Sequence, residues 1–114
     1  MKRDIDRLEH LLDAIERIEK YSIRGKQAFL DDELVQNWIV SHLQIIGEAS
    51  RALSPAFRKK HSVIPWKKIV GMRNIIVHDY FEIDANIVWA VVDGELPKLK
   101  RGVKGILDSL GGKS

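Results

Sequence analysis

The sequence predicts an all-α protein, an up-and-down bundle of four to five helices. Apolar residues recur at spacings of three and four along most of the chain, as they do on the buried face of a helix. No segment shows the alternating apolar and polar pattern of a strand followed by a hairpin turn. The three prolines, Pro55, Pro65 and Pro97, mark boundaries between the helical segments.

The first helix is predicted over residues 4–20, where one face is apolar throughout. The residues on that face are Ile5, Leu8, Leu11, Leu12, Ile15 and Ile18. Two acid-before-base pairs at i,i+4 also stabilise a helix here. These pairs are Asp13 with Arg17 and Glu16 with Lys20.

The second long helix is predicted over residues 31–53, with Asp31 or Asp32 as its N-cap. Its packing stripe follows alternating spacings of three and four, which is typical of a helical bundle. The stripe consists of Val35, Ile39, His42, Ile46, Ala49 and Leu53, and it is widened by Trp38 and Ile45. Between the two helices, residues 22–30 allow a short helical turn.

After the second helix, a basic connection is predicted from Ser54 through Arg58-Lys59-Lys60-His61. These cations suit either a solvated loop or a contact with RNA phosphates. Pro65 then opens a third helix, because proline is favoured in the first turn of a helix. This helix is predicted to extend to about residue 78.

The last predicted helix begins after Asp84, which is a good N-cap residue. Gly94 and Pro97 are expected to disturb this helix, because one is flexible and the other lacks a backbone donor. The helix resumes over residues 98–110, and residues 111–114 are expected to fray.

The chain of 114 residues fits one domain, residues 1–114, and it has no cysteine for a disulfide. No apolar stretch is long enough to span a membrane, and the charged N-terminus lacks a signal-peptide core, so a cytoplasmic location is expected. The net charge of +3 is uneven. Residues 1–57 carry 8 basic and 10 acidic side chains, whereas residues 58–114 carry 11 and 6. The basic half suits either a polyanion or plain solvent.

The residues with the most distinctive chemistry lie at the end of the third helix. On an ideal helix, Arg73 lies about 40° from the apolar Ile69 and therefore shares the packing face. An arginine there is costly unless it is paired or stands at a cleft or interface. His78 lies about 180° from Ile69. The two meet only if the helix ends near His78 or if a second copy of the chain completes the site.

These side chains suit RNA cleavage without a metal. Arg73 has donors that bind a phosphate and stabilise charge developing on it. His78 is able to transfer protons near neutral pH and so promote attack of a 2′-hydroxyl. Tyr80 is able to donate a hydrogen bond, stack on a base or accept a covalent group. No metal or other cofactor is expected, because the histidines are far apart and lack ligand spacing. They are His10, His42, His61 and His78.

Each of these residues also has a purely structural explanation. Arg73 is able to pair with a carboxylate such as Glu48 on the second helix. His78 suits a helix C-terminus, and Tyr80 suits a core. His42 is interpreted as a satisfied core or interface histidine. The tryptophans, Trp38, Trp66 and Trp89, are interpreted mainly as core residues.

The spacing of Arg73, His78 and Tyr80 resembles the R-x4-H-x-Y motif of HEPN domains, and Asn74 fits the polar residue that usually follows the arginine. Over residues 4–110 the sequence is similar to the HepT-type toxins in further places. These are Asp4-Ile5, Ile46-Gly47-Glu48-Ala49, Ile64-Pro65-Trp66-Lys67-Lys68-Ile69 and Gly71-Met72-Arg73-Asn74.

The resemblance implies a homodimeric helical bundle whose two motifs face one cleft. It implies the toxin of a type VII toxin–antitoxin pair, a metal-independent endoribonuclease, with a minimal nucleotidyltransferase as its antitoxin partner. Arg73 and His78 are then catalytic, while Asn74, Tyr80 and Glu48 position the RNA. The antitoxin is expected to transfer AMP to Tyr80, which fills the cleft with negative charge.

Two other functions remain open at the level of the sequence. The chain is also consistent with a catalytically inactive HEPN module that binds and regulates a nucleotidyltransferase. A further possibility is a module that supplies a substrate pocket to that enzyme.

Overall fold

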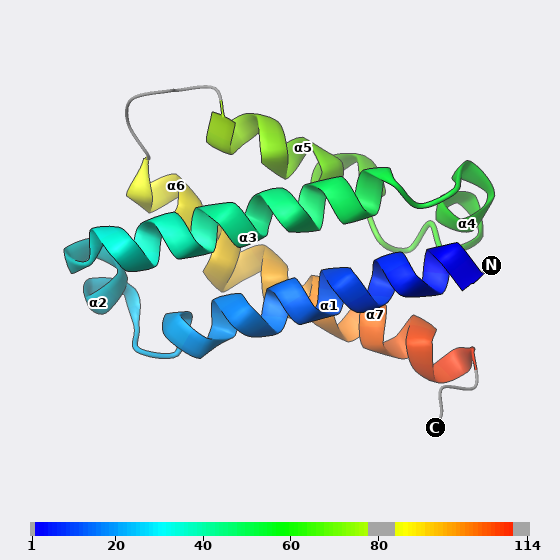
Figure 1. Ribbon diagram of the computed structural model, residues 1–114, viewed down its shortest axis with the longest axis horizontal. Coiled ribbons are helices and arrows are strands. Elements are labelled where there is room, and N and C mark those ends of the chain that lie inside the picture. The colour runs from blue at the N-terminus through cyan, green and yellow to red at the C-terminus, as the bar shows by residue number, and fades with distance from the viewer. Residues whose placement is uncertain (1, 78–83, 111–114) are drawn as a thin grey trace.

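The computed structural model describes residues 2–77 and 84–110, with side chains for residues 3–72 and 84–110. Over these residues the protein is helical and contains no strand, which confirms the predicted all-α bundle. The long helices run alternately up and down, and short helices lie near their ends (Figure 1). The long helices are α1 (Lys2–Ser22), α3 (Glu33–Arg51), α5 (Trp66–Val77) and α7 (Leu96–Ser109). The short ones are α2 (Lys26–Asp31), α4 (Pro55–Lys60) and α6 (Ala85–Ala90).

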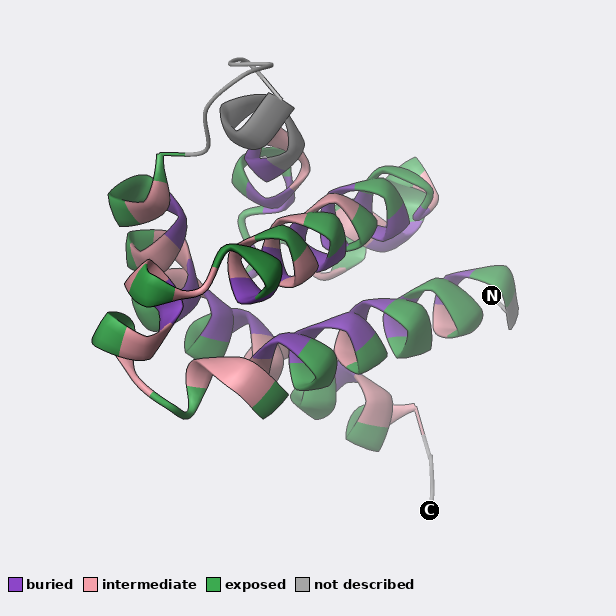
Figure 2. Cartoon of the chain, turned by 60° about the vertical axis from the view of Figure 1, so that its left-hand side comes forward, coloured by how far each residue is buried: buried purple, intermediate pink, exposed green. Residues whose placement is uncertain are grey.

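Helix α3 is the centre of the bundle, because it packs against both α1 and α5, while α1 also packs against α7. Buried residues lie on the sides of the long helices that face one another (Figure 2). The largest fully buried side chains are Leu8, Leu11, Ile15, Ile18, Phe29, Ile39, Leu43, Ile46, Leu53, Ile69, Met72 and Val103. Burying a side chain of this size contributes about 1.5–3 kcal/mol.

Among the described residues, no helix is both long and apolar enough to cross a membrane.

Local signals set the turns between α1 and α3. Gly25 precedes α2 with a φ of 93°, a left-handed conformation that favours glycine. Asp32, rather than Asp31, caps α3, and its carboxylate accepts hydrogen bonds from the backbone of Leu34 (3.0 Å) and Val35 (3.2 Å). The short helical turn predicted within residues 22–30 is the six-residue helix α2.

The predicted connection after α3 is wrong, because it contains the helix α4. Ser54 is its N-cap, and the Ser54 Oγ accepts a hydrogen bond from the backbone N–H of Phe57 (3.2 Å). Asp4 of α1 fixes this cap: its Oδ1 accepts from the Ser54 N–H (2.8 Å) and its Oδ2 from the Ser54 hydroxyl (2.9 Å). The contact that stabilises α4 thus comes from a residue 50 positions away, beyond the reach of a local sequence pattern.

The predicted interruption at Gly94 and Pro97 takes a different form. A π-helical turn, η1 (Val91–Glu95), joins α6 to α7, and the N–H of Leu96 donates to the carbonyl of Val91. Pro97 lies in the first turn of α7, directly after the π-helical turn, and it has no backbone N–H to donate there. Helix α7 therefore begins at Leu96 and not at residue 98. Asp84 caps α6, as predicted.

Candidate functional site

The predicted catalytic motif begins on α5. Arg73 and Asn74 lie in the helical backbone of α5, and their side chains are outside the described residues. His78 and Tyr80 also lie outside the described residues. Glu48 is an exposed residue of α3, the helix that packs against α5. The structure thus places Arg73, Asn74 and Glu48 on two neighbouring helices, and the roles assigned to these residues stay predictions.

The segment of α5 that precedes the motif is anchored in the core. Ile69 and Met72 are each 2% exposed, as expected for two of the residues predicted to form its apolar face. The third, Ile76, has its side chain outside the described residues. Because Ile69 and Met72 fix the rotation of α5 against α3, they also fix the backbone positions of Arg73 and Asn74.

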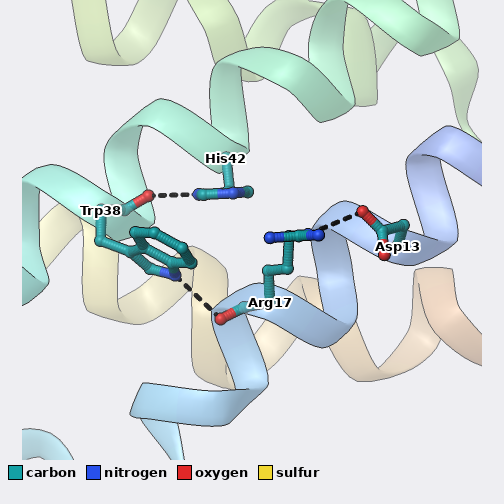
Figure 3. Close-up of polar contacts among 4 residues, drawn as sticks. All are labelled: Asp13, Arg17, Trp38 and His42. Carbon is teal, nitrogen blue, oxygen red and sulfur yellow. Dashed lines mark hydrogen bonds and ion pairs between the residues drawn. The ribbon is translucent and has the colours of Figure 1, made fainter.

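His42 has the structural role that the sequence indicated. It is 9% exposed, its Nδ1 lies 2.7 Å from the carbonyl oxygen of Trp38, and the two rings are 4.4 Å apart (Figure 3). Since a carbonyl only accepts, the Nδ1 carries the hydrogen. The Trp38 indole N–H in turn donates to the carbonyl of Arg17 (3.0 Å), which joins α3 to α1. His42 is therefore a satisfied buried histidine.

The tryptophans belong to the core or its edge, as interpreted. Trp66 is 5% exposed, and Trp38 and Trp89 are partly buried and pack against the core. The Trp89 ring lies 5.4 Å from that of Phe29, which joins α6 to α2. Within residues 3–72 and 84–110, no three histidine, aspartate or glutamate side chains cluster as metal ligands.

The start of α5 is fastened to the end of α4, a contact that sequence reasoning missed. The Trp66 indole N–H donates to the carbonyl of His61 (3.0 Å), and the Trp66 backbone N–H donates to the carbonyl of Ile64 (2.8 Å). Phe57 of α4 is buried, and its ring lies 4.5 Å from that of His61. The sequence hints at this corner only by placing two basic clusters close together, Arg58-Lys59-Lys60 and Lys67-Lys68.

The chain is similar to proteins named as candidate or probable ribonucleases. A family model described as "Ribonuclease HepT-like" matches residues 11–106. A protein of Caldanaerobacter subterraneus, named as a candidate RNase, is 40% identical over 108 residues, which cover 94% of this chain and 96% of that protein. The probable ribonuclease HepT of Thermococcus cleftensis is 36% identical over 96 residues, 83% of this chain and 87% of that protein.

A larger relative comes from Methanocaldococcus jannaschii and is named as a gamma-glutamylcyclotransferase and candidate RNase. It is 36% identical over 112 residues, which cover 96% of this chain. The chain spans about half the length of that relative, 50%. No solved structure matches the chain.

Proposed function

The chain belongs to the family of HepT-like ribonucleases, and we propose from this that it is a metal-independent endoribonuclease, the toxin of a type VII toxin–antitoxin pair. The observation that carries the proposal is the family match over residues 11–106, which includes Arg73, His78 and Tyr80 at the R-x4-H-x-Y spacing. The proposal is also supported by the excess of basic side chains in residues 58–114, which suits a polyanionic substrate.

In the proposed reaction, His78 removes the proton of a ribose 2′-hydroxyl. The 2′-oxygen then bonds to the neighbouring phosphorus, and the bond from phosphorus to the 5′-oxygen breaks. The departing 5′-oxygen takes up a proton from water and His78 returns its proton to the solvent, so the products are a 2′,3′-cyclic phosphate and a 5′-hydroxyl. Arg73 binds the phosphate and stabilises the extra negative charge of the transition state. Asn74, Tyr80 and Glu48 position the RNA around these two residues.

The proposed active form is a homodimer. On an ideal helix Arg73 and His78 point about 140° apart, so a single unbroken helix does not direct both at one phosphate. Two facing copies of the motif bring an arginine of one chain near a histidine of the other. A measurement of molar mass in solution tests this arrangement, and a monomer that cleaves RNA at full rate would contradict it.

The decisive experiment on catalysis compares wild type with His78→Ala and Arg73→Ala on a single-stranded RNA in EDTA. We expect wild type to cleave and each variant to lose about 100-fold or more of the rate. His10→Ala, an exposed histidine of α1, is the matched control and should keep full activity. Equal cleavage by wild type and the motif variants would refute the mechanism.

The proposed antitoxin is a minimal nucleotidyltransferase that modifies Tyr80. The phenolic oxygen of Tyr80 attacks the α-phosphorus of ATP, the new bond joins AMP to the tyrosine, and pyrophosphate leaves. The added phosphate carries negative charge and repels RNA from the cleft. Incubation of both proteins with ATP should raise the intact mass of this chain by whole AMP units.

The chain offers a matched control for that measurement, because it contains only two tyrosines, Tyr21 and Tyr80. We expect Tyr80→Phe to gain no AMP and Tyr21→Phe to gain as much as wild type. If wild type cleaves no RNA yet still binds the nucleotidyltransferase, the chain is the inactive regulatory module that the sequence left open.

A further inference from the structure

A basic pocket opens between α4 and the first two turns of α5, on the segment that precedes the motif. Its volume is about 420 Å³. The lining residues are Pro55, Arg58, Lys59, Trp66, Lys67 and Val70. Three of these six carry a positive charge and none carries a negative one. The sequence explains this, because residues 49–78 contain seven lysines and arginines and no aspartate or glutamate.

The cations of the basic pocket have no carboxylate partner within the described part of the chain. Unpaired cations are common on protein surfaces, but here three of them line one hollow. The Nε of Arg58 is also buried and has no hydrogen-bond acceptor among the described residues. A buried donor without a partner is unfavourable, and an anion in the pocket would give this guanidinium a counter-charge.

The helix dipoles and one ion pair explain the positions of some cations around the basic pocket, but not of all of them. Arg58 and Lys59 lie in the last turn of α4, where the helix dipole favours positive charge. Lys67 and Lys68 lie in the first turn of α5, where the dipole disfavours it and no acidic residue is present. Lys68 is compensated by Glu95 at 3.1 Å. Lys67 has no such partner among the described residues, so the fold gives no reason for its charge.

The walls of the basic pocket are held in place before any ligand arrives. Asp4 fixes the N-cap of α4 through two hydrogen bonds to Ser54. The hydrogen bond from the Trp66 indole to the carbonyl of His61 fixes the start of α5 against the end of α4. A ligand that enters such a preorganised pocket orders little of the protein, which favours binding.

We propose that the basic pocket binds a phosphate of single-stranded RNA that extends beyond the motif. This inference rests on the proposed ribonuclease function for its ligand. Arg58 has the fork of donors that grips a phosphate, while Lys59 and Lys67 add point charges. The apolar edges of Pro55 and Trp66 contact the adjoining sugar or base.

The geometry of α5 connects the basic pocket to the motif. Residue 74 follows Lys67 by seven residues, two helical turns, and therefore starts from the same side of the α5 backbone. The two positions are about 10 Å apart along the helix axis. An RNA strand that lies along α5 reaches from the basic pocket to the motif without a bend. The basic pocket thus sets the register of the strand and favours substrates longer than a dinucleotide.

The test measures binding of a fluorescent single-stranded RNA 12-mer over a range of salt concentrations, in a His78→Ala background that prevents cleavage. We expect Lys59→Gln/Lys67→Gln to weaken binding about tenfold at 0.1 M salt. The slope of log K against log salt should become shallower by about 0.7, the value for one lost phosphate contact on a single strand. Arg101→Gln/Lys104→Gln, which removes the same charge from exposed positions of α7, is the control and should change neither value.

A further variant tests the arginine separately. Arg58→Lys keeps the charge and removes the fork, so it should weaken binding while leaving the salt slope unchanged. The melting temperature of each variant shows whether it is folded. In the Lys59→Gln/Lys67→Gln variant with His78 intact, cleavage of the 12-mer should fall more than cleavage of a dinucleotide, which is too short to reach the basic pocket.

The outcomes separate this proposal from the proposed ribonuclease activity. If no RNA is cleaved but the Lys59/Lys67 variant alone loses RNA affinity, the activity is refuted and the pocket is supported. An unchanged affinity and slope, or an equal loss in the α7 control, would overturn the pocket. So would a variant that binds RNA normally but no longer binds the nucleotidyltransferase, because the pocket would then dock a protein.

Discussion

The contact between α1 and α3 and the corner between α4 and α5 use the same residue types, tryptophan, histidine and arginine, with different results. In the first region the polar groups bond to one another: His42 to the carbonyl of Trp38, Trp38 to that of Arg17, and Arg17 to Asp13. This chain of contacts joins two helices and leaves His42 satisfied.

At the α4–α5 corner the polar groups are only partly satisfied. Trp66 bonds to the carbonyl of His61, but the Nε2 of His61 and the Nε of Arg58 are buried without a partner among the described residues. Folding favours paired polar groups, so the nitrogens of Arg58 and His61, buried and unpaired within the described part of the chain, are positions where a ligand would supply a missing partner. The comparison therefore separates a structural histidine from a candidate binding corner.

The contact with the largest expected effect on stability is the one that joins the two regions, between Asp4 and Ser54. Asp4→Ala removes two hydrogen bonds to a buried carboxylate and should lower the free energy of unfolding by about 1–3 kcal/mol. Asp6→Ala, at an exposed position of the same helix, should change it by less than about 0.5 kcal/mol. Urea denaturation measures both. Equal effects would mean that Asp4 does not hold α4 in place.

The same carboxylate should make stability depend on pH. Burial acts to raise the pKa of Asp4, but hydrogen bonds from the Ser54 backbone and hydroxyl outweigh it, so the pKa lies below its ordinary value of 3.8. The stabilisation is therefore complete above pH 3.8 and is lost as the pH falls through the lower folded pKa. Asp4→Ala should lose less stability than wild type over that acid range, and an identical decline in both proteins would contradict this assignment.

A matched pair of substitutions sharpens the comparison at an intermediate scale. His42→Phe removes the hydrogen bond to Trp38 and should cost about 0.5–1.5 kcal/mol. His61→Phe removes a buried nitrogen that has no described partner, while the ring contact with Phe57 is kept, so stability should stay within about 0.5 kcal/mol or rise. Thermal unfolding of the two variants measures both effects. A larger loss of stability for His61→Phe than for His42→Phe would contradict the conclusion that His42 is the structural histidine of the two.

The smallest expected effect is at the surface of α1. Arg17 and Asp13 form an ion pair at 2.8 Å, but their side chains are 54% and 62% exposed. Arg17→Gln should lower the free energy of unfolding by only about 0.3–0.5 kcal/mol, and 1 M salt should abolish the difference. Arg7→Gln, on the exposed side of the same helix, is the control. A loss above about 1 kcal/mol would show that Arg17 also supports the His42 cluster.

The sequence predicted those parts of the fold that depend on neighbouring residues. Asp32 and Asp84 cap their helices because an aspartate reaches only the next two or three backbone groups. The apolar stripe of α1 also follows from local spacing, and so does that of α3 except at Ile45, which is 44% exposed and does not widen the stripe as predicted. Helix α4 was missed because it has six residues, too few for a periodic pattern, and because its N-cap is held by distant Asp4.

The candidate site was predictable to a lesser extent. The spacing of Arg73 and His78 identified the motif, but spacing on an ideal helix does not bring the two side chains together. The basic pocket escaped prediction because its residues come from two helices separated by the turn at residues 61–65. In the sequence, Arg58 and Lys67 belong to two separate basic clusters, and only folding places them around one hollow.

The packing of α7 against α1 has a consequence for synthesis of the chain on the ribosome. Lys100 bonds to Glu19 at 2.7 Å, across 81 residues of sequence. The apolar face of α1 is able to pack against α3 early in synthesis. Its contact with α7 forms only after residues 96–109, near the end of the sequence, have been translated. A chain that stops before Leu96 would therefore expose part of that face, and it would be a target for chaperones and proteases.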